Sequence, residues 1–225
     1  ETGDYELRRA LGKPGMTNQV LENVITASVE SGIPNIDFYF IMNLPGETDD
    51  ALQKTIDLLG NFYQLAMSKG LKGRIRVSMP NFFPKAGTPF QYAQSGNLYT
   101  YPEKIAHIKT KVGAFMAVSD MDGDVDLLSQ NIMSRGGIEV GLLLSEVYNQ
   151  LRQKEREQGV FSPDTVDEWK QALSALRLKE EVYFAERTTD RPLPWYHIHM
   201  VNIPTSTLIK AWEVYKDRRA LVVID

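Results

Sequence analysis

The chain has 225 residues, of which 43% are apolar and 24% are charged, and this is the composition of an ordinary globular protein. Its net charge of −4, from 25 basic and 29 acidic side chains, argues against a broad surface for nucleic acid or for an anionic membrane. No apolar run approaches the roughly 20 residues that a helix needs to cross a bilayer, and no signal segment opens the chain, so we expect a cytoplasmic protein.

Hydrophobic periodicity predicts strands and helices in the first part of the chain and mainly helices in the rest. Strands are expected at 35–42 and 74–82, and a helix at 50–69 joins them. We expect the two strands to be parallel neighbours. The other helices are predicted at 17–31, which Thr17 would cap, and at 102–118, 138–158, 164–176 and 206–218.

Two segments lack such periodicity. Residues 80–102 are rich in Pro, Gly, Asn and Tyr, and we predict a long ordered loop, which in a compact domain is usually functional. Residues 123–135 are predicted to form a turn-rich connector. After the loop the sequence pattern changes from alternating strands and helices to mainly helices. We therefore place a domain boundary near residue 98, with an α/β domain at 1–98 and a mainly helical region at 99–225.

The most informative stretch is DFYFIMNLPGETDDA, residues 37–51. Its apolar run is typical of a strand that is buried on both faces of a parallel sheet, and Pro45 and Gly46 then stop the strand. The acidic and hydroxyl residues that follow suit the first turn of a helix. Ligands of such folds gather at the carboxyl ends of the strands, so the sequence predicts a site at residues 41–47.

Five blocks of the sequence carry a resemblance to radical S-adenosylmethionine enzymes. FYFIMNLPGETDD (38–50) resembles their "YFMIGLPGETDED" segment, and PNFFPKAGTPFQY (80–92) resembles "SPFVPKPHTPFQW" at the next strand. ETGDYELRRALGK (1–13) resembles the "E-x-G-S-x-x-L-R-x-x-x-x-K" that follows an earlier barrel strand. MSRGGIEVG (133–141) and RPLPWYHIHMVNIPTSTLIKAWE (191–213) resemble the C-terminal region of the cobalamin-binding, YgiQ-like family of these enzymes.

The resemblance implies an α/β fold that is the C-terminal half of a partial (β/α) TIM barrel of the radical S-adenosylmethionine type, followed by the helical region. Such enzymes hold a 4Fe-4S cluster on three closely spaced cysteines, and this chain has no cysteine. We therefore expect the cluster motif in an N-terminal half of the same protein, which would be this chain's partner. The resemblance also implies that cobalamin would be bound by a still earlier domain.

The resemblance further implies residues that contact S-adenosylmethionine. Glu1 and Gly3 match the position where a strand-end carboxylate faces the ribose hydroxyls, although an unpaired chain end would explain Glu1 equally well. Ile41, Met42 and Asn43 fall where the family packs apolar atoms and backbone amides against adenine. The family commonly has Gly at the place of Asn43, and Asn is the next most tolerant residue for a positive φ.

Basic side chains offer further candidates. Lys85, between aromatic residues and prolines after the second strand, is a rigidly presented cation that suits a carboxylate or a phosphate, and we include it among the cofactor-binding residues. We predict a short helix that carries Arg8, Arg9 and Lys13. Either one of these side chains reaches the carboxylate of the methionine moiety, or all three face solvent. Arg135, at a Gly-rich turn, is left open between a carboxylate partner and a substrate phosphate.

The sequence predicts no metal site of its own. The turn contains four alternating aspartates like the start of a calcium loop, Asp120, Asp122, Asp124 and Asp126. Gly and Glu are not at the sixth and twelfth positions of such a loop, so we interpret this turn as a cap for the next helix. His197 and His199 would share one face of a strand. Two ligands are too few for a metal, and a structural role beside Trp195 is favoured.

Two functions remain open at this point. In the first, the chain is the C-terminal portion of a radical S-adenosylmethionine enzyme that helps to bind the cofactor and encloses an unknown substrate. In the second, it is a non-enzymatic binding or assembly module derived from a truncated barrel. The absence of cysteine favours the second function, and the polar blocks at the strand ends favour the first.

Overall fold

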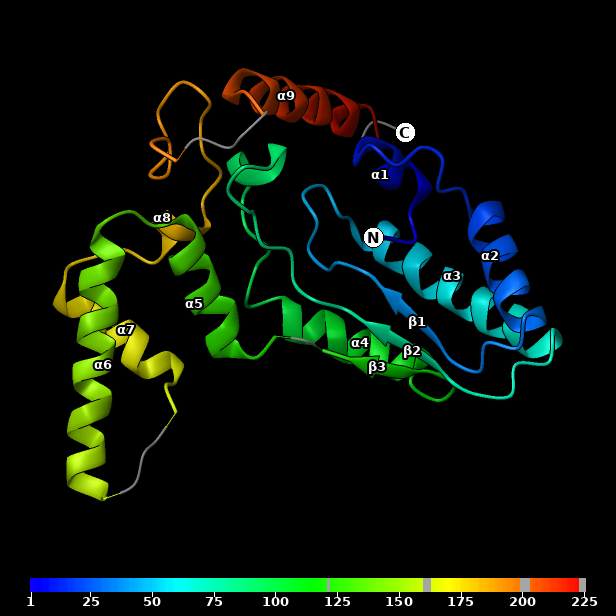
Figure 1. Cartoon of the computed structure of the whole chain (residues 1–225), viewed down its shortest axis with the longest axis horizontal. Helices are drawn as coiled ribbons and strands as arrows, with labels where there is room; N and C mark the ends of the chain where they lie inside the picture. Colours follow the sequence, from blue (N-terminus) through cyan, green and yellow to red (C-terminus); the bar gives the residue numbers. More distant parts are fainter. Residues whose placement is uncertain (121, 160–162, 199–202, 223–225) are drawn as a thin grey trace. The chain divides into compact units, whose positions relative to one another are not determined.

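The computed structural model describes residues 1–120, 122–159, 163–198 and 203–222, and it has a mixed α/β architecture (Figure 1). The chain divides into two compact units. Unit 1 comprises Glu1–Phe82, Tyr99–Met121 and Glu213–Asp225, and unit 2 comprises Phe83–Leu98 and Asp122–Trp212. Residues 83–98 belong to unit 2 and residues 99–121 belong to unit 1, so each unit is built from more than one stretch of the chain, and the boundary near residue 98 stays a prediction.

Unit 1 contains a parallel sheet of three strands in chain order, β1 (Ile36–Tyr39), β2 (Ile75–Ser78) and β3 (Ala117–Ser119). Ile36 pairs with Ile75, and Arg76 pairs with Ala117. The helix α3 (Asp49–Ser68) joins β1 to β2, so the predicted parallel pair is confirmed. The prediction of an α/β fold is also confirmed, whereas its membership of a barrel stays a prediction.

The third strand corrects the prediction of a helix at 102–118. The helix α4 (Tyr101–Val112) ends at Gly113, whose N–H bonds the carbonyl of Lys109 at 2.9 Å, and the chain then extends into β3. A strand of three residues is too short for its alternation to be recognised beside a longer helical pattern. Pairing with β2 stabilises it instead.

The helices of unit 1 begin at capping side chains. Asp4 accepts a hydrogen bond from the N–H of Leu7 at the start of α1 (Tyr5–Ala10). Thr17 caps α2 (Asn18–Glu30), as predicted, and Thr48 caps α3 in the same way. Each such cap satisfies a helix N–H that has no partner within the helix.

The sheet has one covered face and one open face. On the covered side Phe38 of β1 stacks on Phe62 of α3 with 5.2 Å between the ring centroids, and Val77 of β2 is fully buried. The opposite face carries Tyr39, which is 63% exposed, and the exposed ion pair of Asp37 and Arg76. A parallel sheet is ordinarily covered on both faces, so this open, polar face is unusual.

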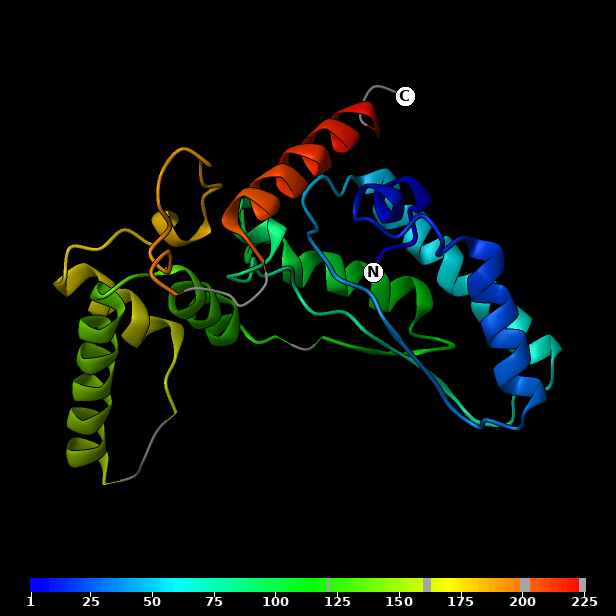
Figure 2. The same ribbon diagram turned by 45° about the horizontal axis from the view of Figure 1, so that its top comes forward.

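Unit 2 is mainly helical. Its helices are α5 (Asp124–Arg135), α6 (Glu139–Gln158), α7 (Val166–Ala175), α8 (Glu181–Phe184), the 3-10 turn η1 (Pro89–Tyr92) and residues 205–212 of α9 (Thr205–Val222). Figures 1 and 2 both show α6 and α7 side by side. Leu143, Trp169 and Ala172 are among the buried residues of their common core.

The helix α5 corrects the prediction of a turn-rich connector at 123–135. The composition of Asp, Gly, Ser and Asn suggested turns, yet Leu127, Leu128 and Ile132 are almost completely buried and stabilise a helix. The carboxylate of Asp126 accepts a hydrogen bond from the N–H of Gly123 at 3.1 Å, so the interpretation of the acidic turn as a cap is confirmed.

None of the helices in the described ranges combines the length and the apolar composition that a membrane crossing requires.

Candidate functional site

The candidate site lies at the carboxyl ends of β1 and β2 in unit 1. There the pairing of the two strands continues beyond their regular part, because Met42 forms a parallel bridge with Asn81. The N–H of Met42 donates to the carbonyl of Pro80 at 2.9 Å, and the N–H of Phe82 donates to the carbonyl of Met42 at 2.9 Å. The two strands therefore end together, as expected of parallel neighbours.

Asn43 occupies the left-handed region, with φ of 56°. This is the conformation for which glycine is the usual residue and asparagine a tolerated one, so the argument made from the sequence for this position is confirmed. The side-chain amide of Asn43 donates to the Oδ1 of Asn81 at 2.8 Å. The two asparagines thus tie the strand ends to each other.

An ion pair stands next to the asparagines. The Nζ of Lys104 lies 2.6 Å from the Oε1 of Glu47, and the carboxylate is only 5% exposed. The same oxygen accepts a hydrogen bond from the N–H of Asn43 at 3.2 Å. We call Asn43, Glu47, Asn81 and Lys104 the rim cluster.

The sequence analysis missed two members of the rim cluster. Asn81 comes three residues after β2 and Asn43 comes four residues after β1, so an asparagine soon after each strand was a usable signal. Lys104 gave no such signal. It lies on α4, 57 residues from its partner, and only the packing of that helix brings it to the strand ends.

The backbone of Glu1 lies beside β1. The N–H of Ile41 donates to the carbonyl of Glu1 at 2.8 Å, and the amino nitrogen of Glu1 donates to the carbonyl of Tyr39 at 3.3 Å. In a parallel ladder one residue bonds in this way to the two residues that flank its neighbour on the next strand. Glu1 therefore occupies the position of a parallel strand on the side of β1 away from β2.

The side chain of Glu1 points to a cation within the chain. It forms an ion pair with Lys13. Burial works to raise the pKa of this carboxyl, but the hydrogen bond from Lys13 and the positive charges of the amino terminus and of Lys13 together outweigh burial, and the pKa lies below its usual value. Arg8 does not face solvent. It is 1% exposed, and it donates to the carbonyls of Thr2 at 2.7 Å and Met16 at 2.9 Å.

Gly3 contacts a helix. Its N–H donates to the Oγ1 of Thr55 on α3 at 2.8 Å, and a Cβ at this position would lie 2.2 Å from the Cα of Thr55. The absence of a side chain at Gly3 is thus explained by close packing against α3.

The Pro45–Gly46 turn contacts the last helix of the chain. The hydroxyl of Tyr215 on α9 donates to the carbonyl of Pro45, and a Cβ on Gly46 would meet the side chain of Arg219. Burial raises the pKa of Tyr215 to about 12. Gly46 also has φ of 84°, which favours glycine. This turn therefore has a packing role whether or not a ligand binds beside it.

Two of the basic candidates belong to unit 2, whereas Glu1, Gly3, Ile41, Met42 and Asn43 all belong to unit 1. Lys85 is exposed, and its Nζ lies 5.2 Å from the ring centre of Phe83. Arg135 is completely buried and donates to the carbonyls of Ala93 at 2.9 Å and Ala185 at 2.6 Å. It ties backbone segments together and pairs with no carboxylate among the described residues.

The described part of the chain brings no three His, Cys, Asp or Glu side chains together in a way that suits a metal ion. Of the histidine pair, His197 is exposed and its ring lies edge-on to Tyr196. His199 lies outside the described residues. Comparisons of the chain with protein-family models, with curated proteins and with solved structures gave no match.

Proposed function

We propose that this chain is the C-terminal portion of a radical S-adenosylmethionine enzyme, and that its strand ends contribute part of the adenosine-binding site. The observation that carries the proposal is the parallel order of the strand ends. Glu1, β1, β2 and β3 follow one another in space as they do in the chain, with helices between them. Consecutive parallel strands joined by helices are the repeating unit of a (β/α) barrel.

The open face of the sheet supports the same proposal. In a barrel one face of every strand looks into the interior, and the helices cover the other face. Here the exposed face of the sheet is polar, with Arg76 bound to Asp37 by two hydrogen bonds of 2.6 and 2.7 Å. A face of this kind suits the interior of an incomplete barrel that surrounds a polar cofactor or substrate. The remaining strands would be supplied by an N-terminal half of the same protein.

The residues of this chain fit adenosine, one of the groups that the resemblance implies, but they do not fit the 4Fe-4S cluster. Ile41 and the left-handed backbone of Asn43 offer apolar contact and close backbone approach, and these suit an adenine ring, whereas the side chain of Met42 is 1% exposed and belongs to the core. No residue of the chain offers a thiolate for a 4Fe-4S cluster, since cysteine is absent. We therefore derive no chemical step through the cluster, and a role for cobalamin rests on the resemblance alone.

A second function is favoured by the pairing of polar groups in the rim cluster and at Glu1. Asn43 bonds to Asn81, Glu47 to Lys104, and Glu1 to Lys13, so the polar groups at the strand ends have partners without a ligand. Polar groups that already have partners suit a non-enzymatic binding or assembly module, in which they only stabilise the end of the sheet.

One titration distinguishes the two functions. The purified chain is labelled with nitrogen-15 and titrated with S-adenosylmethionine as the probe. The adenosine proposal expects weak, saturable shifts of the backbone amides at residues 41–46. Binding is weak because half of a barrel offers only part of the contacts. Asn43→Val should abolish the shifts, since a β-branched residue resists positive φ, whereas Asn43→Gly should keep them.

Lys85→Ala is the matched control, and it should leave the shifts at 41–46 unchanged. Binding that disappears only in Lys85→Ala would mean that the site lies on the other loop. A wild-type chain whose strand-end amides do not respond to S-adenosylmethionine would overturn the adenosine proposal and leave the assembly module as the better function.

A further inference from the structure

Unit 2 contains a cavity that the proposed function does not use. Its volume is about 670 Å³, and all of its lining residues belong to unit 2. It is enclosed by η1, by residues 189–198 and by the first turns of α9. Cavities of 300–1,000 Å³ are the usual size for a small organic ligand.

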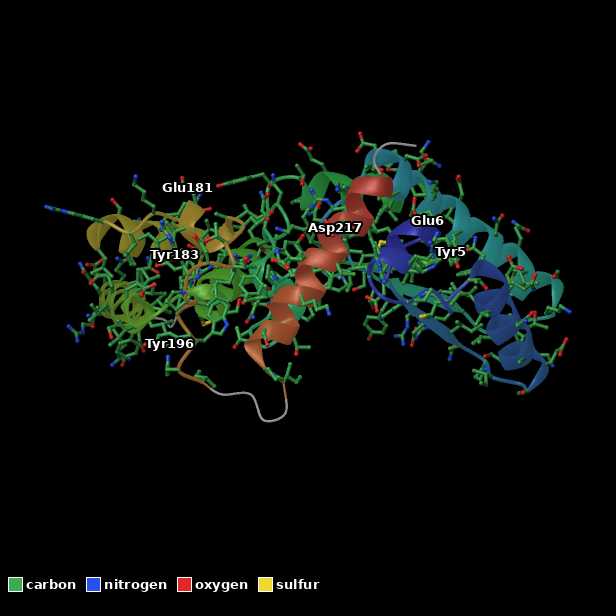
Figure 3. The ribbon with its side chains drawn as sticks, turned by 90° about the horizontal axis from the view of Figure 1, so that it is seen from above. Tyr5, Glu6, Glu181, Tyr183, Tyr196 and Asp217 are labelled. Atoms are coloured by element: carbon green, nitrogen blue, oxygen red, sulfur yellow. The ribbon has the colours of Figure 1, made fainter. Side chains whose placement is uncertain are left out.

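The walls of the cavity are mostly apolar and aromatic. Leu193 and Leu208 are less than 10% exposed, and Trp195 supplies an indole ring. Ile203, Ile198 and Tyr196 also line the cavity and are 42%, 62% and 70% exposed (Figure 3 labels Tyr196). Exposed apolar side chains gathered around a hollow lose contact with water when a flat apolar molecule enters.

Hydrogen bonds join two walls of the cavity to each other. The Oε1 of Gln91 on η1 accepts from the Nε1 of Trp195 at 2.8 Å and from the N–H of Gly87 at 3.1 Å. The N–H of Arg187 donates to the carbonyl of Tyr92 at 2.8 Å. Because these groups satisfy one another, the cavity is formed before a ligand arrives and little affinity is lost to ordering.

Positive charge lies behind this wall. The guanidinium of Arg187 stands 5.3 Å from the ring centre of Trp195, and it also donates to the carbonyl of Arg135. Arg135 is completely buried, and the Nε atoms of both arginines have no hydrogen-bond partner within the described part of the chain. Burial and the charge of Arg187 together lower the pKa of Arg135 to about 10.

No carboxylate among the described residues lies within ion-pair distance of either arginine. Glu139 acts on Arg187 through its charge, but its Oε1 accepts hydrogen bonds from Gly137 at 2.9 Å and from Tyr183 at 3.4 Å. The buried guanidinium of Arg135 therefore has no carboxylate partner among the described residues, whereas the charge of Glu139 acts on the half-buried guanidinium of Arg187.

Two further features at the cavity favour an anion. The amino end of α9 lies there, since Pro204 and Thr205 are lining residues, and the first N–H groups of a helix carry partial positive charge. Arg191 adds a guanidinium at the exposed edge, beside one carboxylate, Asp190.

We propose that this cavity binds a flat, largely apolar small molecule that carries one anionic group. The apolar body lies between Trp195 and the aliphatic side chains of α9. The anionic group lies toward the amino end of α9 and Arg191.

Two probes with the same ring system separate the two parts of the proposal. 8-Anilinonaphthalene-1-sulfonate is flat, apolar and anionic, and N-phenyl-1-naphthylamine has the same body without the sulfonate. We expect the purified chain to bind one equivalent of the sulfonate about tenfold more tightly than the uncharged probe. Arg191→Gln should weaken the sulfonate several-fold and leave the uncharged probe unchanged. Equal affinities of the two probes would overturn the anionic part.

Variants of exposed residues test the location. Ile203→Asp should weaken the sulfonate at least tenfold, because it places a carboxylate in the apolar wall. Leu142→Asp is the matched control on α6, where the leucine is 65% exposed and outside the cavity, and it should change nothing. Equal effects of the two variants would overturn the site.

A measurement on the unaltered chain keeps the test independent of how the variants fold. The ring protons of the bound sulfonate should give nuclear Overhauser contacts to the methyl groups of Leu193 and Leu208. A bound probe without contacts to these methyl groups would also overturn the site.

Discussion

Gly3→Ala tests whether Gly3 serves packing or ligand approach. The N-terminal segment lies so close to α3 that a Cβ on residue 3 would stand 2.2 Å from the Cα of Thr55 and 2.6 Å from the carbonyl oxygen of Lys54. Ordinary contacts of a Cβ begin near 3.4 Å, and both neighbours are backbone atoms of a helix. The segment must therefore move away from α3 by more than 1 Å.

The cost has two parts. Overpacking of this kind typically destabilises a protein by about 1–3 kcal/mol. The movement also breaks the hydrogen bond of 2.8 Å between the N–H of Gly3 and Thr55, which contributes about 1 kcal/mol. We expect Gly3→Ala to lower the free energy of unfolding of unit 1 by about 2–4 kcal/mol.

Urea denaturation followed by far-ultraviolet circular dichroism measures the change, and amide hydrogen exchange of α3 assigns it to unit 1. Gly60→Ala is the matched control, because a Cβ at this position inside α3 meets no atom within 4 Å. Alanine in a helix interior should stabilise by roughly 0.5–1 kcal/mol relative to glycine. Gly3→Ala with unchanged stability and lost response to S-adenosylmethionine would refute the packing argument and favour a ligand contact.

Two further predictions concern charge and metal. Burial works to raise the pKa of Glu168, but hydrogen bonds from Lys154 and Thr165 outweigh it and lower the pKa from 4.5 to about 2. This carboxylate should therefore stabilise unit 2 above pH 4.5, by on the order of 2 kcal/mol after solvent screening of Lys154, and the stabilisation should disappear as the pH falls from 4.5 to 2. Denaturation followed by tryptophan fluorescence at pH 7 and pH 3 should show a smaller pH effect in Glu168→Gln than in the wild type, and equal effects would contradict the assignment. Anaerobic reconstitution with iron and sulfide should leave the 225-residue chain without a stoichiometric 4Fe-4S cluster, since it has no cysteine, and a bound cluster would contradict the proposal that the cluster lies elsewhere in a longer protein.

The regular part of unit 1 was predictable because its signals are local. A long apolar run, a Pro-Gly turn and an amphipathic helix follow one another, and they give β1, α3 and β2. The two misses have different causes. β3 has only three residues and depends on pairing with β2, whereas α5 has a turn-like composition that burial of Leu127, Leu128 and Ile132 overrides.

The candidate site was predictable only where one residue carries its own conformational signal. Asn43 is such a residue, because the resemblance has glycine at this position and asparagine is the next most tolerant residue for positive φ. The ion pair of Glu47 with Lys104 joins residues 57 positions apart, and no local pattern indicates it. For the same reason the packing of Gly3 on Thr55 and the burial of Arg135 appear only in the folded chain.

The distribution of tryptophan makes the two proposed sites separable by experiment. The chain has three tryptophans, Trp169, Trp195 and Trp212, and all of them belong to unit 2. A ligand in the cavity contacts Trp195 and should change its fluorescence, whereas adenosine at the strand ends of unit 1 is detected by backbone amide shifts at residues 41–46. Because each site has its own reporter, failure of the adenosine proposal leaves the cavity proposal standing, and failure of the cavity proposal leaves the barrel proposal standing.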